Sequence, residues 1–282
     1  MTADAGRSGD GVVLTIHGAR GSTPVSGAPF LRYGGSTIAM SVRTGPSRYL
    51  ILDCGTGIVA LGDGLDSAGG CEFDVLFTHY HWDHIQGLPF FAPLWDPASS
   101  FTFHGSPWKD LGLEALIAGT FGPPWFPVAL ADTKAAKRYV ELSGESIAVG
   151  PLRVRWTRLN HPQGVTGYRI DGPNASVVVA TDHEAGVTAD TDRALTILAR
   201  GADVLIHDAQ YTDGEYELHH EGWGHSTWRQ AVTAAHTAGV RRLVLISHDP
   251  GRTDEGVDSV VGQARVEFPE TEAAYEGMTI SL

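Results

Sequence analysis

The sequence has few cysteines and no long apolar run, and both absences exclude whole classes of protein. Only two of its 282 residues are cysteines, Cys54 and Cys71, so we expect no disulfide framework and predict two buried, small apolar side chains. No apolar run approaches the roughly 18 residues of a transmembrane helix. Residues 1–11 are polar and glycine-rich and lack the apolar core of a secretory signal peptide. These absences predict a cytoplasmic protein that does not enter a membrane.

Basic residues are also scarce. Lysine and arginine number 20 against 33 aspartates and glutamates, which gives a formal net charge of -13. An acidic surface disfavours binding to nucleic acids or anionic membranes, whereas a bound metal can still attract a small anionic substrate. Because the chain has the length of one large α/β domain and no low-complexity linker, we expect a single domain over residues 11–282. Residues 1–10 are predicted to form a disordered tail.

One stretch concentrates side chains that bind metals. His79, His81, Asp83 and His84 fall within six positions, directly after the predicted buried strand Phe73 to Phe77. An extended backbone places the first two histidines on the same side, and a turn lets the other two side chains reach the same space. Imidazoles and carboxylates suit zinc, manganese or iron. The alternative, a polar loop whose histidines only cap backbone groups, does not explain four such residues together.

The rest of the chain alternates between predicted strands and helices, and polar side chains recur where strands end. His161, Asp182 and His248 each follow an apolar strand, and ligands tend to bind at strand ends in open sheets. The alternation favours two packed sheets flanked by helices. Strands are predicted over 12–16, 35–42, 49–52, 73–77, 101–104, 152–159, 168–170, 176–180, 204–206, 243–246 and 278–282. Helices are predicted over 58–65, 111–118, 191–200, 227–238 and 254–268.

Three further segments leave more than one interpretation open. In the glycine-containing loop 17–24, Arg20, Ser22 and Thr23 either bind phosphate oxygens of a substrate or belong to an ordinary turn. Asp53 either orients a metal-binding histidine or caps the following helix. The proline-stiffened aromatic loop Thr120 to Pro127 either walls a substrate pocket, forms a partner surface such as that of a homodimer, or packs over the core.

The stretch from His79 to His84 resembles the HxHxDH signature of the metallo-β-lactamase superfamily, and the later ligand positions follow in the same order. The resemblance covers nearly the whole chain. It implies an αββα sandwich, in which two mixed sheets are flanked by helices, and a site for two divalent ions. Zinc is the expected metal, with manganese or iron as alternatives. The implied ligands are His79, His81 and His161 for the first ion, Asp83, His84 and His248 for the second, and Asp182 bridging both.

A narrower resemblance concerns the second half of the chain. Residues 206–211, with His207 and Asp208, and the triplet 225–227, which begins with His225, are similar to the paired HEAT-like and HST motifs of RNase Z and its phosphodiesterase relatives. That resemblance implies that Asp208, in place of a glutamate, orients His225 as general acid. RNase Z carries a long arm for tRNA between its third and fourth motifs. Here only residues 162–181 separate those positions, as in the armless phosphodiesterases.

These motifs predict a metal-dependent phosphodiesterase that acts on a small or cyclic nucleotide-like phosphodiester. Water activated between two metals would attack phosphorus, Asp83 would bind metal and water, and His225 would protonate the leaving oxygen. The same ligands also suit hydrolysis of a lactone, β-lactam or thioester, although those branches generally lack the Asp208–His225 pair. A tRNA 3′-processing endonuclease is less favoured without the arm. A non-catalytic metal-bound sensor domain is the remaining alternative.

Overall fold

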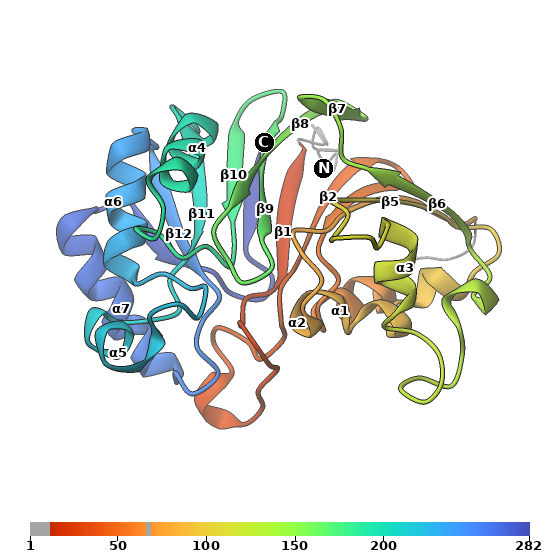
Figure 1. Ribbon diagram of the computed structural model, residues 1–282, viewed down its shortest axis with the longest axis horizontal. Helices are drawn as coiled ribbons and strands as arrows, with labels where there is room; N and C mark the ends of the chain where they lie inside the picture. Colours follow the sequence, from red (N-terminus) through yellow and green to blue (C-terminus); the bar gives the residue numbers. More distant parts are fainter. Residues whose placement is uncertain (1–11, 66–68) are drawn as a thin grey trace, which may run out of the picture.

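A computed structural model describes residues 12–65 and 69–282, so the predicted tail over residues 1–10 lies outside the described part. Two seven-stranded sheets pack against each other and carry helices on their outer faces (Figure 1). This arrangement confirms the predicted αββα sandwich. Within the described part of the chain, no helix is long and apolar enough to cross a membrane.

The first sheet gathers the amino-terminal strands and one strand from the other end of the chain, in the order β14-β1-β2-β3-β4-β5-β6. Strands β3 to β6 run parallel, whereas β14, β1, β2 and β3 pair antiparallel. The strands are β1 (Val13–Gly18), β2 (Ala39–Gly45), β3 (Arg48–Leu52), β4 (Glu72–Leu76), β5 (Ser100–Gly105), β6 (Ala136–Glu141) and β14 (Thr279–Ser281). Helices α1 (Ile58–Asp63), α2 (Trp82–Ile85) and α3 (Leu113–Ala118) cover its outer side (Figure 1).

The second sheet has the order β13-β12-β11-β10-β9-β8-β7. Its strands are β7 (Ser146–Val149), β8 (Leu152–Leu159), β9 (Val165–Asp171), β10 (Ser176–Ala180), β11 (Val204–Asp208), β12 (Arg242–Ile246) and β13 (Thr271–Ala273). Helices α4 (Ala189–Ala199), α6 (Trp228–Ala238) and α7 (Asp254–Glu267) lie outside it, whereas α5 (Asp213–Glu215) and the π-helix η5 (Tyr216–His220) belong to the loop before α6. Short 3-10 helices lie at Ala28–Phe30, Leu88–Phe90, Ala92–Trp95 and Leu130–Asp132.

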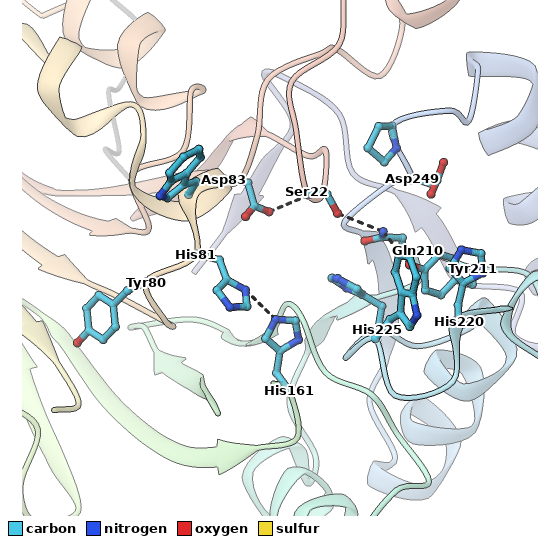
Figure 2. Close-up of a pocket in the computed structure, with 13 residues that line it drawn as sticks. Ser22, Tyr80, His81, Asp83, His161, Gln210, Tyr211, His220, His225 and Asp249 are labelled. Atoms are coloured by element: carbon cyan, nitrogen blue, oxygen red, sulfur yellow. Dashed lines mark hydrogen bonds between the residues drawn. The ribbon is translucent and has the colours of Figure 1, made fainter. Parts of the chain in front are cut away.

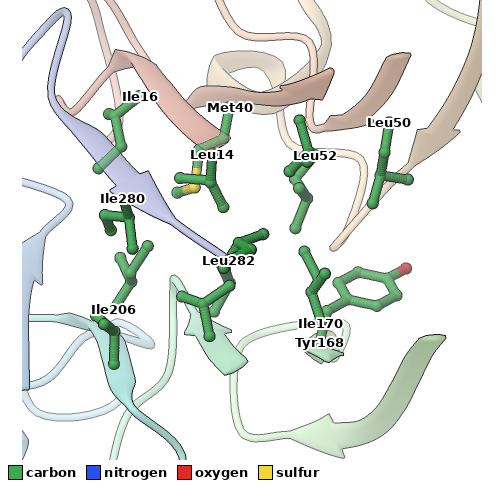
Figure 3. Packing of buried hydrophobic residues seen from close by; sticks show 14 of the residues in the cluster. Leu14, Ile16, Met40, Leu50, Leu52, Tyr168, Ile170, Ile206, Ile280 and Leu282 are labelled. Atoms are coloured by element: carbon green, nitrogen blue, oxygen red, sulfur yellow. The ribbon is translucent and has the colours of Figure 1, made fainter. Parts of the chain in front are cut away.

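Apolar residues fill the space between the two sheets. Leu14, Met40 and Leu52 of the first sheet pack towards Tyr168 and Ile206 of the second (Figure 3). The central strands are apolar on both faces because the outer face of each sheet also packs against helices and loops. Every strand that the sequence predicts is present, with its ends shifted by a few residues. Strands β6, β7 and β13 were not predicted, since they are short or carry charged side chains at the sheet edges.

Candidate metal and active site

The histidine-rich stretch leaves β4 of the first sheet and enters the short helix α2. His81 is the residue before this helix, and Asp83 and His84 lie within it. The chain therefore turns within six residues, and the side chains before and within the helix approach one space from two directions, as predicted. Asp83 and His84 are buried, and the aspartate carboxylate accepts a hydrogen bond of 2.8 Å from the backbone N–H of Ser22.

The second sheet supplies the opposite side of the site. His161 follows β8, Asp182 follows β10, Asp208 ends β11, and His225 lies shortly before α6. Ligand atoms within 4.8 Å of one another form three groups in the described residues. The groups are His79, His81 and His161; His79, His84 and Asp182; and His161, Asp182 and His225. Residues from both sheets thus converge at one edge of the sandwich.

Two of the histidines face each other in a way that favours a cation. The Nδ1 atom of His161 donates to the carbonyl of Gly224 at 2.7 Å, and the Nε2 atom of His81 donates to Oε1 of Gln163 at 2.8 Å. Each ring therefore offers a lone pair on its other nitrogen, and these two nitrogens are 3.1 Å apart. Lone pairs at this distance repel each other, so a metal ion fits between them.

The buried atoms around Asp182 fit a metal as well. Its Oδ2 atom is 3.5 Å from Nε2 of His79 and 3.2 Å from Nε2 of His84. The His79 nitrogen has no hydrogen-bond partner among the described residues. Burial lowers the pKa of His79 well below its usual value and that of His161 to about 4, so both rings are neutral, as metal ligands must be.

Asp53 orients His84 from behind. Its Oδ2 atom accepts hydrogen bonds from Nδ1 of His84 at 2.8 Å and from the hydroxyl of Thr78 at 2.7 Å. Helix α1 begins after Gly57, and no side chain of the described residues caps it. Of the two predicted roles of Asp53, helix capping is therefore wrong. Burial lowers the pKa of His84, but Asp182, Asp83 and Asp53 together hold it well above its usual value. This excess of negative charge also favours a cation at the site.

His225 and Asp208 form the predicted pair. The Nδ1 atom of His225 donates to Oδ2 of Asp208 at 2.7 Å, and the backbone N–H of Ser226 donates to the other carboxylate oxygen at 2.8 Å. Burial lowers the pKa of His225, but Asp208 and Asp182 raise it to a net value of about 9. The imidazole is therefore protonated at neutral pH and can donate a proton.

His248 does not join the other predicted ligands. Its Nε2 atom donates to the carbonyl of Ala274 at 2.9 Å, and its ring packs edge-on against Tyr33. None of the three ligand groups found among the described residues includes it. Asp83 is also outside these groups, but its Oδ2 atom lies 3.4 Å from Nε2 of His84. The residue follows β12 as predicted, but its backbone pairs with the loop at Ala19 and Gly21, and the Ala274 carbonyl engages its ring.

The three predicted substrate-binding residues have different places. Arg20 is fully buried, and its guanidinium donates to the carbonyls of Gly34 and Arg252 at 2.8 and 2.7 Å. The prediction that Arg20 binds substrate is therefore wrong, because its donors hold neighbouring loops together. Ser22 lines the cavity beside the site, whereas Thr23 is exposed and lines neither of the two cavities described below.

A cavity of about 670 Å³ opens beside the converging side chains (Figure 2). Its lining residues include His81, Asp83, His161 and His225. The remaining lining residues are Ser22, Tyr80, Trp82, Gln210, Tyr211, His220, Trp223, Asp249 and Pro250. The aromatic loop over residues 120–127 lines neither this cavity nor the second one, and its Trp125 side chain is 80% exposed.

Sequence reasoning missed Glu184, which supports the site from within the second half. This buried carboxylate accepts hydrogen bonds from the backbone N–H groups of Gly222 and Gly224 at 2.6 and 2.8 Å, and from the hydroxyl of Tyr216 at 2.7 Å. It thereby fixes the loop whose Gly224 carbonyl holds His161. The only signal in the sequence is an acidic residue two positions after Asp182.

Comparisons with known proteins agree with this arrangement. The family model described as "Beta-lactamase superfamily domain" matches residues 48–248. The chain is 26% identical over 254 residues to "Ribonuclease BN" of Salmonella paratyphi C (strain RKS4594), a match that covers 72% of this chain and 79% of that protein. The crystal structure of the metallo-beta-lactamase fold protein YhfI from Bacillus subtilis superimposes with a TM-score of 0.73 at 17% identity, covering 97% of this chain and 100% of that one. A diphosphatase from the PhnP family has a TM-score of 0.67 at 18% identity, with coverage of 96% and 98%.

Proposed function

The chain belongs to the metallo-β-lactamase superfamily, and from this premise we propose that it is a metal-dependent hydrolase of small or cyclic nucleotide-like phosphodiesters. The observation that carries the proposal is the hydrogen bond between His225 and Asp208 at the wall of the cavity. An alkoxide leaves phosphorus readily only when a general acid protonates it, and a protonated imidazole can act as that acid.

The residues proposed to hold the metals follow from the convergence of the side chains. His79, His81 and His161 would hold one divalent cation, Asp83 and His84 a second, and Asp182 lies between the two sets. Two divalent cations supply an activated water and neutralise charge on the phosphate oxygens when they are bound. Zinc suits these nitrogen and oxygen donors, and manganese or iron are the alternatives.

The chain's own side chains have separate roles in the proposed reaction. Ser22 fixes one carboxylate oxygen of Asp83, which leaves the other oxygen to accept a hydrogen bond from the attacking water. Asp208 keeps the His225 ring charged and oriented, and the free Nε2–H of His225 donates its proton to the leaving oxygen. Hydrolysis then yields a phosphomonoester and an alcohol.

A small substrate is proposed rather than tRNA. Only the β9–β10 hairpin lies between His161 and Asp182, so the arm that RNase Z uses for tRNA has no counterpart at this place. The net charge of -13 also disfavours a polyanionic partner. The ribonuclease name of the relative from Salmonella agrees with phosphodiester chemistry in general.

Hydrolysis of bis-p-nitrophenyl phosphate and of 2′,3′- and 3′,5′-cyclic nucleotides by metal-loaded protein tests the proposal. His225→Ala should lower kcat for cyclic nucleotides by about 10²–10⁴-fold. The loss for bis-p-nitrophenyl phosphate should be smaller, because nitrophenolate leaves without a proton. His236→Ala, an exposed histidine on α6, is the control and should retain full activity. Turnover of lactones or thioesters without any phosphodiester hydrolysis would replace the proposal with a carbonyl hydrolase.

A further inference from the structure

A second cavity, of about 1030 Å³, adjoins the paired histidines His81 and His161. It shares Tyr80, His81 and His161 with the first cavity, so the two spaces meet at the candidate metal ligands. Its walls come from the segment after β5, from β8 and from the turn before β9. A substrate that spans the ligands therefore places one half in each cavity.

The two cavities carry opposite charge. Asp83 and Asp249 line the first cavity, and no lysine or arginine is among its described lining residues. Lys109 and Arg158 line the second, and no described residue around it is acidic. In a chain with a net charge of -13, two cations therefore lie beside the candidate metal ligands. The charged half of an asymmetric substrate is thus favoured in the second cavity and an uncharged half in the first.

The cations of the second cavity are exposed and have no acidic partner among the described residues. The Lys109 ammonium lies 4.3 Å from the ring centroid of Trp108. The Arg158 guanidinium packs closely over Gly164. A Cβ atom added to this glycine would lie only 2.7 Å from Nη2 of Arg158. Neither cation makes an ion pair with a residue in the described ranges 12–65 and 69–282. Both remain available to bind an anion.

Two half-buried tryptophans, Trp108 and Trp156, complete the walls of this cavity. Flat heteroaromatic rings stack on indoles, and such contacts are largely independent of which base is present. A nucleobase near the tryptophans and an anion near the cations would therefore use both features of the cavity. Because His225 lines only the first cavity, the leaving oxygen belongs on that side.

We propose that the second cavity binds the retained half of the diester, and that this half is a nucleoside carrying a second phosphate at its far end. This inference rests on the proposed function. Water adds its oxygen to phosphorus and the ester bond to the leaving group breaks. The leaving oxygen takes the proton of His225, and the resulting uncharged alcohol departs through the first cavity. The nucleotide with two phosphates is released from the second.

A matched pair of chromogenic substrates tests this orientation. Thymidine 5′-(p-nitrophenyl phosphate) and its 3′-phosphorylated form share the leaving group and differ only in the second phosphate. The 3′-phosphate should raise kcat/KM by about tenfold or more, as expected for charged hydrogen bonds. The double variant Lys109→Gln/Arg158→Gln should lose this gain. Arg153→Gln removes one positive charge from β8 outside the cavity and should keep it.

The outcomes separate the two proposals. Equal kcat/KM for both thymidine substrates, or a gain that the double variant keeps, would overturn the second-cavity proposal while leaving phosphodiester hydrolysis intact. If no phosphodiester is hydrolysed, the proposed function fails. Ligand binding then tests the second-cavity proposal independently of activity. Quenching of tryptophan fluorescence should then show that thymidine 3′,5′-bisphosphate binds to the wild type at least tenfold more tightly than thymidine does. The double variant should not show this difference. Equal binding of the two ligands to the wild type would overturn the proposal.

Discussion

The carboxylate of Glu184 accepts a 2.8 Å hydrogen bond from the backbone N–H of Gly224, the residue whose carbonyl holds His161. A single buried acid thus connects the exit of β10 to the loop that precedes His225. The contact joins two segments 40 residues apart in the sequence. Accurate placement of both histidines therefore depends on a residue that is not itself among the predicted ligands.

Glu184→Ala should lower kcat by about 10²-fold, because small displacements of reacting groups have large effects on rate. The free energy of unfolding should also fall, by about 1–3 kcal/mol, because the N–H groups of Gly222 and Gly224 lose their acceptor. Steady-state kinetics and denaturant unfolding measure the two effects. Glu217→Ala, an exposed acid on η5, is the control. Unchanged kinetics in Glu184→Ala would contradict the positioning role.

The pKa of His225 predicts the alkaline limit of activity. Burial lowers this pKa, but Asp208 and Asp182 raise it to about 9. A general acid must be protonated, so kcat for cyclic nucleotides should begin to fall near pH 9 and drop about tenfold per pH unit above it. Asp208→Asn removes a cause of the raised pKa, and its alkaline limb should move to lower pH. An identical limb in both proteins would show that another group limits the reaction.

Asp53 should control metal affinity. The residue has a φ of 57°, and asparagine tolerates this left-handed conformation, so Asp53→Asn removes the charge without straining the backbone. Loss of the charged acceptor for Nδ1 of His84 should weaken metal binding about 10–100-fold. Competition with a chromogenic chelator measures the affinity. Asp63→Asn, at the end of α1, should bind metal as the wild type does.

Arg20 should matter for stability rather than for substrate binding. Its guanidinium is fully buried and lies 3.9 Å from the buried carboxylate of Asp254. Arg20→Ala removes the buried cation beside this carboxylate and the donors of the Gly34 and Arg252 carbonyls, so the free energy of unfolding should fall by about 3–5 kcal/mol. Arg43→Ala, on the exposed face of β2, should change it by less than about 1 kcal/mol. A stable Arg20→Ala protein with a raised KM would restore the substrate-binding role.

The parts of the site that depend on local sequence were predictable. His79, His81, Asp83 and His84 come from a single turn after a buried strand, so their convergence needs no knowledge of distant contacts. His161 and Asp182 also leave central strands at the same edge of the second sheet. The apolar run of β10 and the alternation of β8 identified these strands, whereas the charged edge strand β6 has no such pattern.

The parts that depend on contacts between loops were not predictable. His248 leaves β12 as expected, but the Ala274 carbonyl and Tyr33 determine what its ring contacts. Nothing beside His248 in the sequence indicates either partner. Arg20 is a residue type that often binds phosphate, but here its guanidinium donates to backbone carbonyls more than 200 positions away. The role of Glu184 likewise depends on a loop that folds over it.

The division of the candidate ligands between two sheets has a consequence for how the protein would acquire a metal. His79, His81, Asp83 and His84 belong to the segment after β4, whereas His161 and Asp182 are supplied by the other sheet. A folding intermediate with only one sheet in place holds an incomplete set of donors and binds metal weakly. Tight metal uptake therefore reports that the two halves have docked, and metal content can serve as a measure of the correctly folded fraction in a preparation.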